Sequence, residues 1–210
     1  MNKSRRTIAT TVTTAALAAA LTLPITGTAT AATLQPTTSG SSTAAPQISS
    51  RGMLRSLNYR KLCVRHAFFQ GELTPCPTRS SDAADFSFKA VPVQGHSNLY
   101  RLAPTNKNLT RFYLRHENYR IVLSKVPPKS NKAAYALFLK DSAFYLRTGR
   151  SGKGISFESY NFPGWYIRHR NFHLYISKEG EPGDRHFKGD ASFSSFNVID
   201  WGPESVPVEE

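Results

Sequence analysis

A short motif occurs three times in this sequence, and it limits the possible folds more than any other feature. Each copy reads apolar residue, Arg, His, any two residues and then an aromatic ring. The three copies are residues 64–69, 114–119 and 167–172. Further along the chain each copy is followed by the pattern Asp-x-(Ser or Ala)-Phe, at residues 85–88, 141–144 and 190–193.

The spacing between the copies is nearly constant. The motif histidines are 50 and then 53 residues apart, and each His precedes its Asp by 19 to 25 residues. Self-similarity at a near-fixed period is typical of repeat architectures. We therefore expect three copies of one structural unit, at about 53–97, 99–150 and 154–200.

The units read as short strands. Residues 155–159 alternate in polarity, and a Pro-Gly turn at 163–164 precedes the next apolar stretch. No stretch keeps an apolar period of 3.6 residues, although residues 133–140 could form a helical turn. Short strands with turn signals every 8–12 residues or so are typical of all-β folds. Three units of about four strands predict a β-trefoil, a barrel capped by three hairpins with pseudo-threefold symmetry; a β-sandwich is the alternative.

The two ends of the chain differ from the repeats in composition. Basic residues at the start, an apolar run over 15–24 and small residues before position 32 are typical of a secretory signal peptide, residues 1–31. Residues 32–50 are rich in Thr, Ser and Ala without periodicity, which predicts a disordered linker. The repeats then form one domain over 51–201, and we expect a loose tail over 202–210.

These end segments also predict where the protein goes. The apolar run is shorter than the roughly 20 residues that cross a bilayer. We therefore expect a secreted, extracellular protein without a membrane anchor. The signal peptide resembles a bacterial one, and Arg5-Arg6 is compatible with the twin-arginine export route.

The net positive charge limits the classes of binding partner that we expect. The chain has 27 Lys and Arg against 14 Asp and Glu, a formal net charge of +13. Lys3, Arg5 and Arg6 lie in the predicted signal peptide, and the other basic residues are scattered through all three units. No run of five or more basic residues and no nucleic-acid motif occurs. A basic exported domain of this kind fits an acidic wall or plant polysaccharide better than DNA or RNA. We expect a monomer with no nucleic-acid partner.

The sequence has two cysteines, Cys63 and Cys76, and both lie in the first unit. Outside the cytoplasm an even pair this close usually forms a disulfide. We therefore expect a Cys63–Cys76 bond that staples unit one, without a counterpart in the other units.

The residue types that recur in each unit suit recognition of a small sugar. A carboxylate accepts hydrogen bonds from hydroxyls, an imidazole can donate or accept one more, and an aromatic face packs on sugar C–H groups. The alternative is that His and Asp hold each unit together, and the residues alone leave both roles open. The motif arginines alternate with the histidines along a strand, so we expect them on its opposite side in a structural or surface role: Arg65, Arg115 and Arg168.

Residues 156–172 resemble the arabinose-binding domain of fungal and actinobacterial α-L-arabinofuranosidase B. The resemblance rests on Asn-Phe-Pro-Gly, Arg-His-x-x-Phe and the later Asp-x-Ser-Phe, and it extends over about 53–201. That family, family 42 of the carbohydrate-binding modules, is a β-trefoil that binds arabinofuranose side chains of arabinoxylan and related hemicelluloses. The resemblance implies a secreted, non-catalytic protein that binds L-arabinose units in one shallow pocket per unit and stands alone without its catalytic domain.

The same resemblance implies which residues line each pocket: the motif His, the ring that follows it, the Asn beside that ring and the distant Asp. In unit three these are His169, Asn171, Phe172 and Asp190. In unit two they are His116, Asn118, Tyr119 and Asp141. In unit one they are His66, Phe69 and Asp85, with Phe68 where the other units have Asn.

We expect no catalytic residue, metal or cofactor. Glycoside hydrolysis needs two carboxylates across one bond, whereas the acids here come one per unit. His169 and His173 are four residues apart on a strand and turn and lack a third ligand. Two other functions stay open: a secreted protein-binding trefoil such as a protease inhibitor, with the basic loop 125–132 as its contact, and an accessory module of an α-L-arabinofuranosidase system.

Overall fold

The structure is a computed structural model that describes residues 51–181 and 184–197. The predicted signal peptide, linker and tail lie outside these residues. The described residues form twelve strands and three short helices. In order these are β1 (Arg51–Ser56), β2 (Leu62–Ala67), β3 (Gln70–Pro75), η1 (Ser80–Phe86), β4 (Ser87–Pro92), β5 (Leu99–Pro104), β6 (Phe112–Glu117), β7 (Arg120–Lys125), α1 (Lys132–Asp141), β8 (Phe144–Thr148), β9 (Ile155–Ser159), β10 (Trp165–Arg170), β11 (His173–Lys178), α2 (Phe187–Asp190) and β12 (Phe193–Asn197).

Six of the strands pair in a closed ring. β1 pairs with β4, β4 with β5 and β5 with β8. β8 pairs with β9, β9 with β12, and β12 returns to β1. All these pairings are antiparallel, so the sheet closes on itself and these strands leave few unpaired edges. The predicted all-β class is confirmed.

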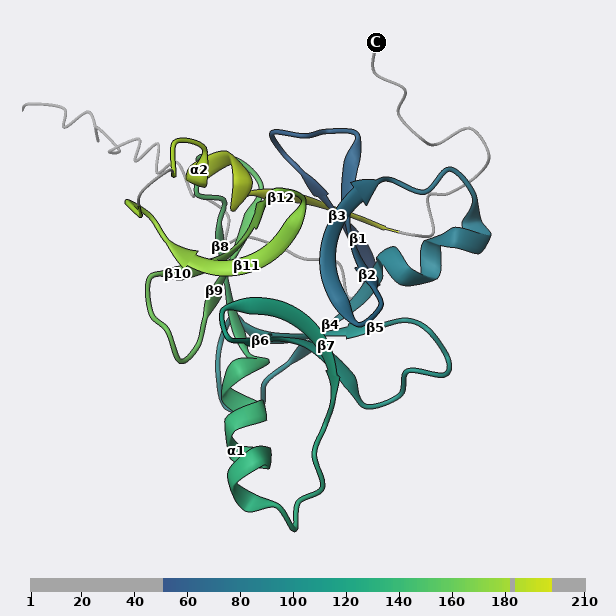
Figure 1. The fold of residues 1–210 in the computed structure, drawn as a ribbon, viewed down its shortest axis with the longest axis vertical. Coiled ribbons are helices and arrows are strands. Elements are labelled where there is room, and N and C mark those ends of the chain that lie inside the picture. Colours follow the sequence, from purple (N-terminus) through teal and green to yellow (C-terminus); the bar gives the residue numbers. More distant parts are fainter. Residues whose placement is uncertain (1–50, 182–183, 198–210) are drawn as a thin grey trace, which may run out of the picture. The chain divides into compact units, whose positions relative to one another are not determined.

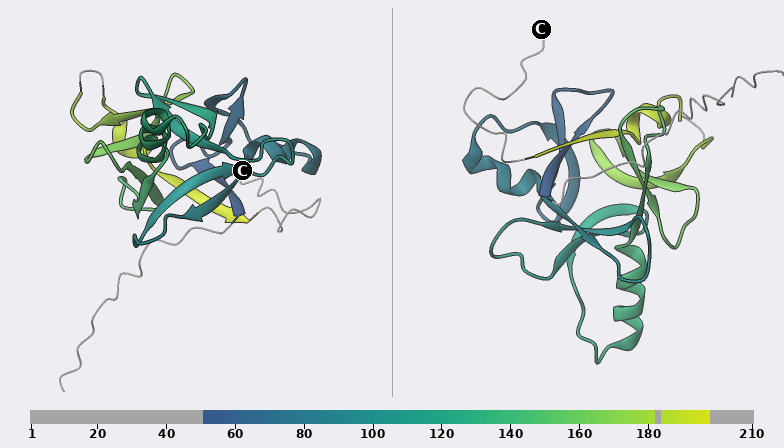
Figure 2. Two further views of the ribbon diagram at one scale, coloured as in Figure 1. Left: turned by 90° about the horizontal axis from the view of Figure 1, so that it is seen from below. Right: turned by 180° about the vertical axis from the view of Figure 1, so that it is seen from behind.

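The other six strands form three hairpins, β2–β3, β6–β7 and β10–β11. Their second strands also pair with one another, β3 with β7, β7 with β11 and β11 with β3. Figure 1 shows the hairpins around a common centre, and Figure 2 shows them from behind. Arg120 ties this centre together, because its guanidinium donates to the backbone oxygens of Gly71 and Leu174, each at 2.6 Å.

Each hairpin turns through two residues that both have positive φ. These pairs are Phe68-Phe69, Asn118-Tyr119 and Asn171-Phe172, with φ between 49° and 65°. Two-residue loops with positive φ at both positions match the twist of the strands they join, and Asn is favoured there. The hairpin tips carry the predicted pocket rings, so this turn fixes where those rings lie.

The core lies inside the ring and under the hairpins. The phenylalanines that end each Asp-x-(Ser or Ala)-Phe pattern are at most 3% exposed, and they are Phe88, Phe144 and Phe193. Each unit supplies equivalent apolar residues to one cluster, which is what a threefold sequence repeat requires. Burying a side chain of this size stabilises the fold by about 1.5–3 kcal/mol.

The helices were predicted less well from the sequence than the strands. The helical turn expected over 133–140 is a ten-residue helix, α1. Neither the 3-10 helix η1 nor the helix α2 was predicted. Within the described residues no helix is long and apolar enough to cross a membrane. The Cys63–Cys76 disulfide is present as predicted.

Candidate functional site

The motif His and the distant Asp of each unit come together in space, although 19 to 25 residues separate them. The distance from the imidazole Nε2 to the nearer carboxylate oxygen is 3.7 Å for His66–Asp85. It is 3.5 Å for His116–Asp141 and 3.6 Å for His169–Asp190. The predicted pairing therefore occurs in all three units.

An Asn side chain bridges each pair, and it comes from the following unit. In unit one the Asn106 amide nitrogen donates to Asp85 at 2.8 Å, while its oxygen lies 2.9 Å from Nε2 of His66. Asn161 bridges His116 and Asp141 in the same way, at 2.9 and 2.8 Å. An amide oxygen only accepts hydrogen bonds, so these contacts place a proton on the imidazole Nε2.

In unit three the bridge closes the circle, because Asn58 belongs to unit one. Its amide donates to Asp190 at 2.6 Å and its oxygen lies 3.0 Å from Nε2 of His169. Ser56 adds to this cluster, because its hydroxyl donates to Asn58 at 2.7 Å and lies 3.1 Å from the same imidazole nitrogen. Each His–Asn–Asp cluster thus links two neighbouring units. We call these contacts the first, second and third junctions, numbered by the unit that supplies the His.

The motif arginine reaches the other oxygen of the same carboxylate, contrary to our expectation. Arg168 donates to Oδ2 of Asp190 at 2.6 Å and is also paired with Asp184. Arg115 donates to Asp141 at 3.2 Å. The prediction that Arg and His face opposite sides is wrong for these contacts, because the long guanidinium arm reaches round to the carboxylate. The structural role predicted for these arginines fits their contacts.

Each acid stands at the end of a short helix. Asp141 and Asp190 are the last residues of α1 and α2, and Asp85 is the next-to-last residue of η1. A carboxylate is disfavoured near the C-terminus of a helix, where the backbone carbonyls point outward. The Asn and Arg donors compensate for this, so the clusters have a clear role in holding the units together.

Burial separates unit one from the other two. The Asp85 side chain is 41% exposed, whereas those of Asp141 and Asp190 are 7% and 9% exposed. The three histidines are all buried. Burial lowers the pKa of His169; Asp190 partly offsets this effect and Arg168 adds to it. The imidazole in unit three is therefore held neutral near pH 7.

The predicted pocket rings lie outside the clusters and are about half exposed. The exposed fractions are 54% for Phe69, 49% for Tyr119 and 53% for Phe172. Each tip also binds the next hairpin through its backbone, because its carbonyl oxygen accepts a hydrogen bond of 2.8 Å. The donors are the N–H groups of Leu123, Ile176 and Leu73 respectively.

The rings pack against aromatic side chains of the following unit. Phe69 stacks on Phe112 at 5.8 Å between ring centroids. Tyr119 stacks on Trp165 at 5.1 Å. Phe172 meets Tyr59 edge to face at 6.0 Å. Every junction therefore carries both a His–Asn–Asp cluster and a half-exposed aromatic surface.

Two residues that sequence reasoning put near the pockets, Asn118 and Asn171, have another role in the turn. Asn118 and Asn171 occupy its first position at φ 49° and 51°, and Phe68 occupies the equivalent place at φ 49°. Asn tolerates this left-handed conformation better than other residues that carry a Cβ. None of the bridging contacts to His or Asp comes from them.

The bridging residues Asn58, Asn106 and Asn161 were missed. Asn58 and Asn161 each stand eight residues before their unit's motif His, and Asn106 stands ten before. That spacing was visible, but it suggests a contact within a unit. The actual partner lies in the preceding unit, which becomes apparent only once the ring is closed.

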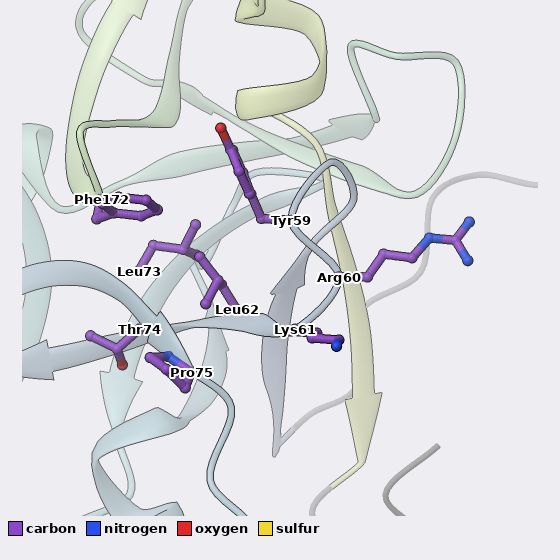
Figure 3. A pocket seen from close by; sticks show the side chains of 8 residues that line it. All are labelled: Tyr59, Arg60, Lys61, Leu62, Leu73, Thr74, Pro75 and Phe172. Atoms are coloured by element: carbon purple, nitrogen blue, oxygen red, sulfur yellow. The ribbon is translucent and has the colours of Figure 1, made fainter. Parts of the chain in front are cut away.

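A pocket of about 520 Å³ lies beside the cluster of unit three. Figure 3 shows Phe172 and Tyr59 on two sides of it, with Leu62 and Leu73 between them. The pocket is largely apolar, and Arg60, Lys61, Thr74 and Pro75 complete its lining.

A family model described as the Alpha-L-arabinofuranosidase B (ABFB) domain matches residues 52–195, which are nearly all of the described part. The chain belongs to the AbfB domain family. The match contains all three His–Asn–Asp clusters and all three tip rings. The clusters are therefore features of an AbfB domain, and the family relation supports an arabinose-related role.

Known proteins similar to this AbfB domain carry arabinofuranosidase names. An alpha-L-arabinofuranosidase of Hypocrea jecorina is 35% identical over 82 residues, which are 39% of this chain and 15% of that protein. A probable alpha-L-arabinofuranosidase B of Aspergillus clavatus is 38% identical over 94 residues, 44% of this chain and 17% of that one.

Solved structures show the same fold. An arabinofuranosidase complexed with arabinofuranosyl-alpha-1,2-xylobiose has a TM-score of 0.63 at 19% identity, over 74% of this chain and 33% of that one. A GH54 a-l-arabinofuranosidase soaked with a cyclic sulfate inhibitor gives 0.63 at 20% identity, with the same coverage. The AbfB domain thus spans a minor part of each relative.

Proposed function

We propose that this AbfB domain binds L-arabinofuranose side chains of polysaccharides such as arabinoxylan and does not cleave them. The observation that carries the proposal is the threefold junction. In each unit a His–Asn–Asp cluster lies next to a half-exposed aromatic ring, within a domain whose relatives bear arabinofuranosidase names. On this basis we assign the domain to family 42 of the carbohydrate-binding modules.

The exposed rings supply most of the contact in this proposal. A sugar ring packs its C–H face on Phe69, Tyr119 or Phe172. The side-chain amide of the bridging Asn and the edge of the cluster then meet its hydroxyls. Asp85 is the acid most open to such contact, since its side chain is 41% exposed.

The same reasoning extends the fold assignment. A closed ring of six strands with three hairpins whose second strands pair in a triangle supports the β-trefoil. Equivalent residues in each unit then occupy equivalent places, which supports one sugar pocket per unit. Each pocket binds weakly, and binding to a branched polymer gains from multivalency.

A non-catalytic role is supported by the separation of the acids. Each of the three junctions holds one motif Asp, and cleavage of a glycosidic bond needs a pair of carboxyl groups about 5–9.5 Å apart across it. The 82 residues that match the arabinofuranosidase of Hypocrea jecorina are only 15% of that protein. We therefore regard the domain as an accessory that holds substrate for an arabinofuranosidase, with export directed by the predicted signal peptide and with the domain acting as a monomer.

The test is affinity electrophoresis in gels that contain arabinoxylan, debranched arabinan or unsubstituted xylan. We expect retardation by arabinoxylan and none by unsubstituted xylan. The variants Tyr119→Ala and Phe172→Ala should each weaken retardation, and the double variant should abolish most of it. Leu137→Ala is the matched control, because Leu137 is equally exposed at 55% and is neither a tip ring nor a member of a His–Asn–Asp cluster. Equal migration with and without arabinoxylan would refute the proposal.

A second candidate function is binding of another protein. The loop that precedes α1 exposes the basic side chain of Lys129, and α1 itself exposes Lys132 and Leu137. Capture of a partner from culture supernatant that Leu137→Ala abolishes and arabinose does not compete would favour this function.

A further inference from the structure

The pocket beside Phe172 is a gap that the other two junctions fill. Its equivalent positions can be identified from the hairpin register. Each hairpin begins with a residue that pairs with the last residue of the same hairpin: Leu62 with Pro75, Phe112 with Lys125 and Trp165 with Lys178. These three first residues therefore correspond to one another.

Two of the three corresponding residues are aromatic and cover the preceding hairpin tip. Phe112 stacks on Phe69 with an angle of 28° between the ring planes. Trp165 stacks on Tyr119 with an angle of 18°. At the third junction Leu62 stands in this place, so no ring covers Phe172 in that way, and the pocket of about 520 Å³ opens there.

The rest of the third junction matches the second closely. Tyr59 lies edge to face against His169 at 5.3 Å, as Phe162 does against His116 at 5.1 Å. Tyr59 also meets Phe172 at 6.0 Å, as Phe162 meets Tyr119 at 5.9 Å. The second junction is a cluster of three rings completed by Trp165. The third junction has two of those rings, and the place of the indole is open.

We propose that this pocket binds a planar aromatic group, which stacks on Phe172 above Leu62 and takes the position that Trp165 holds at the second junction. Figure 3 shows the two rings and the leucine floor that would receive it. Stacking geometry at the other two junctions gives the expected arrangement, nearly parallel planes with centroids 5.1–5.8 Å apart. A volume of this size is typical of small-molecule sites.

The charge around the pocket favours one chemical class. Arg60 and Lys61 are among its lining residues, with the Arg60 guanidinium directed away from the two rings (Figure 3), and no acidic side chain lines it. An aromatic group with a carboxylate, or with a phenol oxygen that accepts a hydrogen bond from Lys61, is therefore preferred over one with a cation. Such a group can be a free aromatic acid or an aromatic acyl group esterified to a sugar. Neither source requires that the domain binds arabinofuranose, although at unit three the aromatic group would share Phe172 with the proposed sugar site.

The experiment is a calorimetric titration with p-coumarate. The protein is residues 32–210, which is the chain without the predicted signal peptide. Methyl p-coumarate tests the role of the carboxylate, and cyclohexanecarboxylate tests the need for a planar ring. A p-coumaroyl ester of methyl arabinofuranoside, compared with the free acid, distinguishes the two sources. We expect saturable binding of p-coumarate at one site, with Kd of about 1 mM or tighter, and at least tenfold weaker binding of cyclohexanecarboxylate.

Two variants make the test specific to the gap. Leu62→Trp supplies the missing ring and should weaken p-coumarate binding at least tenfold while raising Tm. Trp165→Leu opens the second junction and should raise the number of sites from one to two. Phe172→Ala should abolish the original site. Arabinoxylan binding retained by Leu62→Trp would show that the sugar sites of units one and two do not need this pocket. Unchanged p-coumarate affinity in Leu62→Trp, or no saturable binding by the wild type up to about 10 mM, would overturn the inference.

Discussion

Unit one and unit three carry the same His–Asn–Asp cluster in different surroundings. Asp190 is buried, accepts from Arg168 at 2.6 Å and from Asn58 at 2.6 Å, and is fully engaged with protein donors. Asp85 is 41% exposed, and Arg65 lies 3.9 Å away from it. The same motif can therefore form a buried contact between units, as in unit three, or a solvent-exposed polar site, as in unit one. The aromatic tips, by contrast, are about half exposed in every unit.

The largest expected effect comes from removing the two acids in turn. Asp190→Ala leaves the guanidinium of Arg168 buried with one partner fewer, and loss of one partner of a buried pair costs about 3–5 kcal/mol. Asp85→Ala removes an exposed pair and should cost about 1 kcal/mol or less. Urea denaturation of both variants measures the difference. Equal destabilisation would show that exposure does not separate the two clusters.

Acid should weaken unit three through His169, whose pKa is lowered mainly by burial. The unfolded chain then binds a proton more readily than the folded one, so stability is lost as pH falls below about 6.5. One such group changes the free energy of unfolding by at most about 1.4 kcal/mol per pH unit. Urea midpoints between pH 7.5 and 5 measure the slope, and His169→Gln should flatten it. A slope that the variant leaves unchanged would assign the effect to another group.

The smallest effect concerns the turn of unit one. Phe68 is 95% exposed and holds the left-handed position where the other hairpins have Asn. Phe68→Asn should therefore stabilise the protein by about 0.5–1 kcal/mol. Asn118→Phe is the reverse change in unit two and should destabilise by a similar amount. Thermal unfolding of both variants would show whether the turns are equivalent, and a loss of stability in Phe68→Asn would mean that Phe68 has a contact role.

Sequence reasoning predicted those parts of this protein that repeat along the chain. The pairing of His169 with Asp190 followed from three copies of one spacing. The strand predicted over residues 155–159 is β9, because its polarity alternates. Arg168 was placed on the wrong side, since alternation describes where a side chain starts and not how far a long one reaches.

Two of the features that could not be predicted depend on how the ring of six strands closes. Asn58 bridges a pair more than 100 residues away, and its short-range spacing pointed to its own unit. Helix α2 has four residues, too few for an apolar period to show. The pocket at Leu62 required knowing which ring each hairpin tip meets in the next unit. The bridging Asn58 and the pocket at Leu62 join units, whereas the predicted features lie within a unit.

The central claim is that sugar meets the junctions, with the tip rings and bridging amides at the contact. The most direct measurement is the change in NMR shifts of the labelled domain on addition of methyl α-L-arabinofuranoside. We expect the largest changes at the backbone amides of the tips and the side-chain amides of the bridging residues, which are Phe69, Tyr119, Phe172, Asn58, Asn106 and Asn161. Changes confined to α1 and the loop before it, or none at millimolar sugar, would contradict the account.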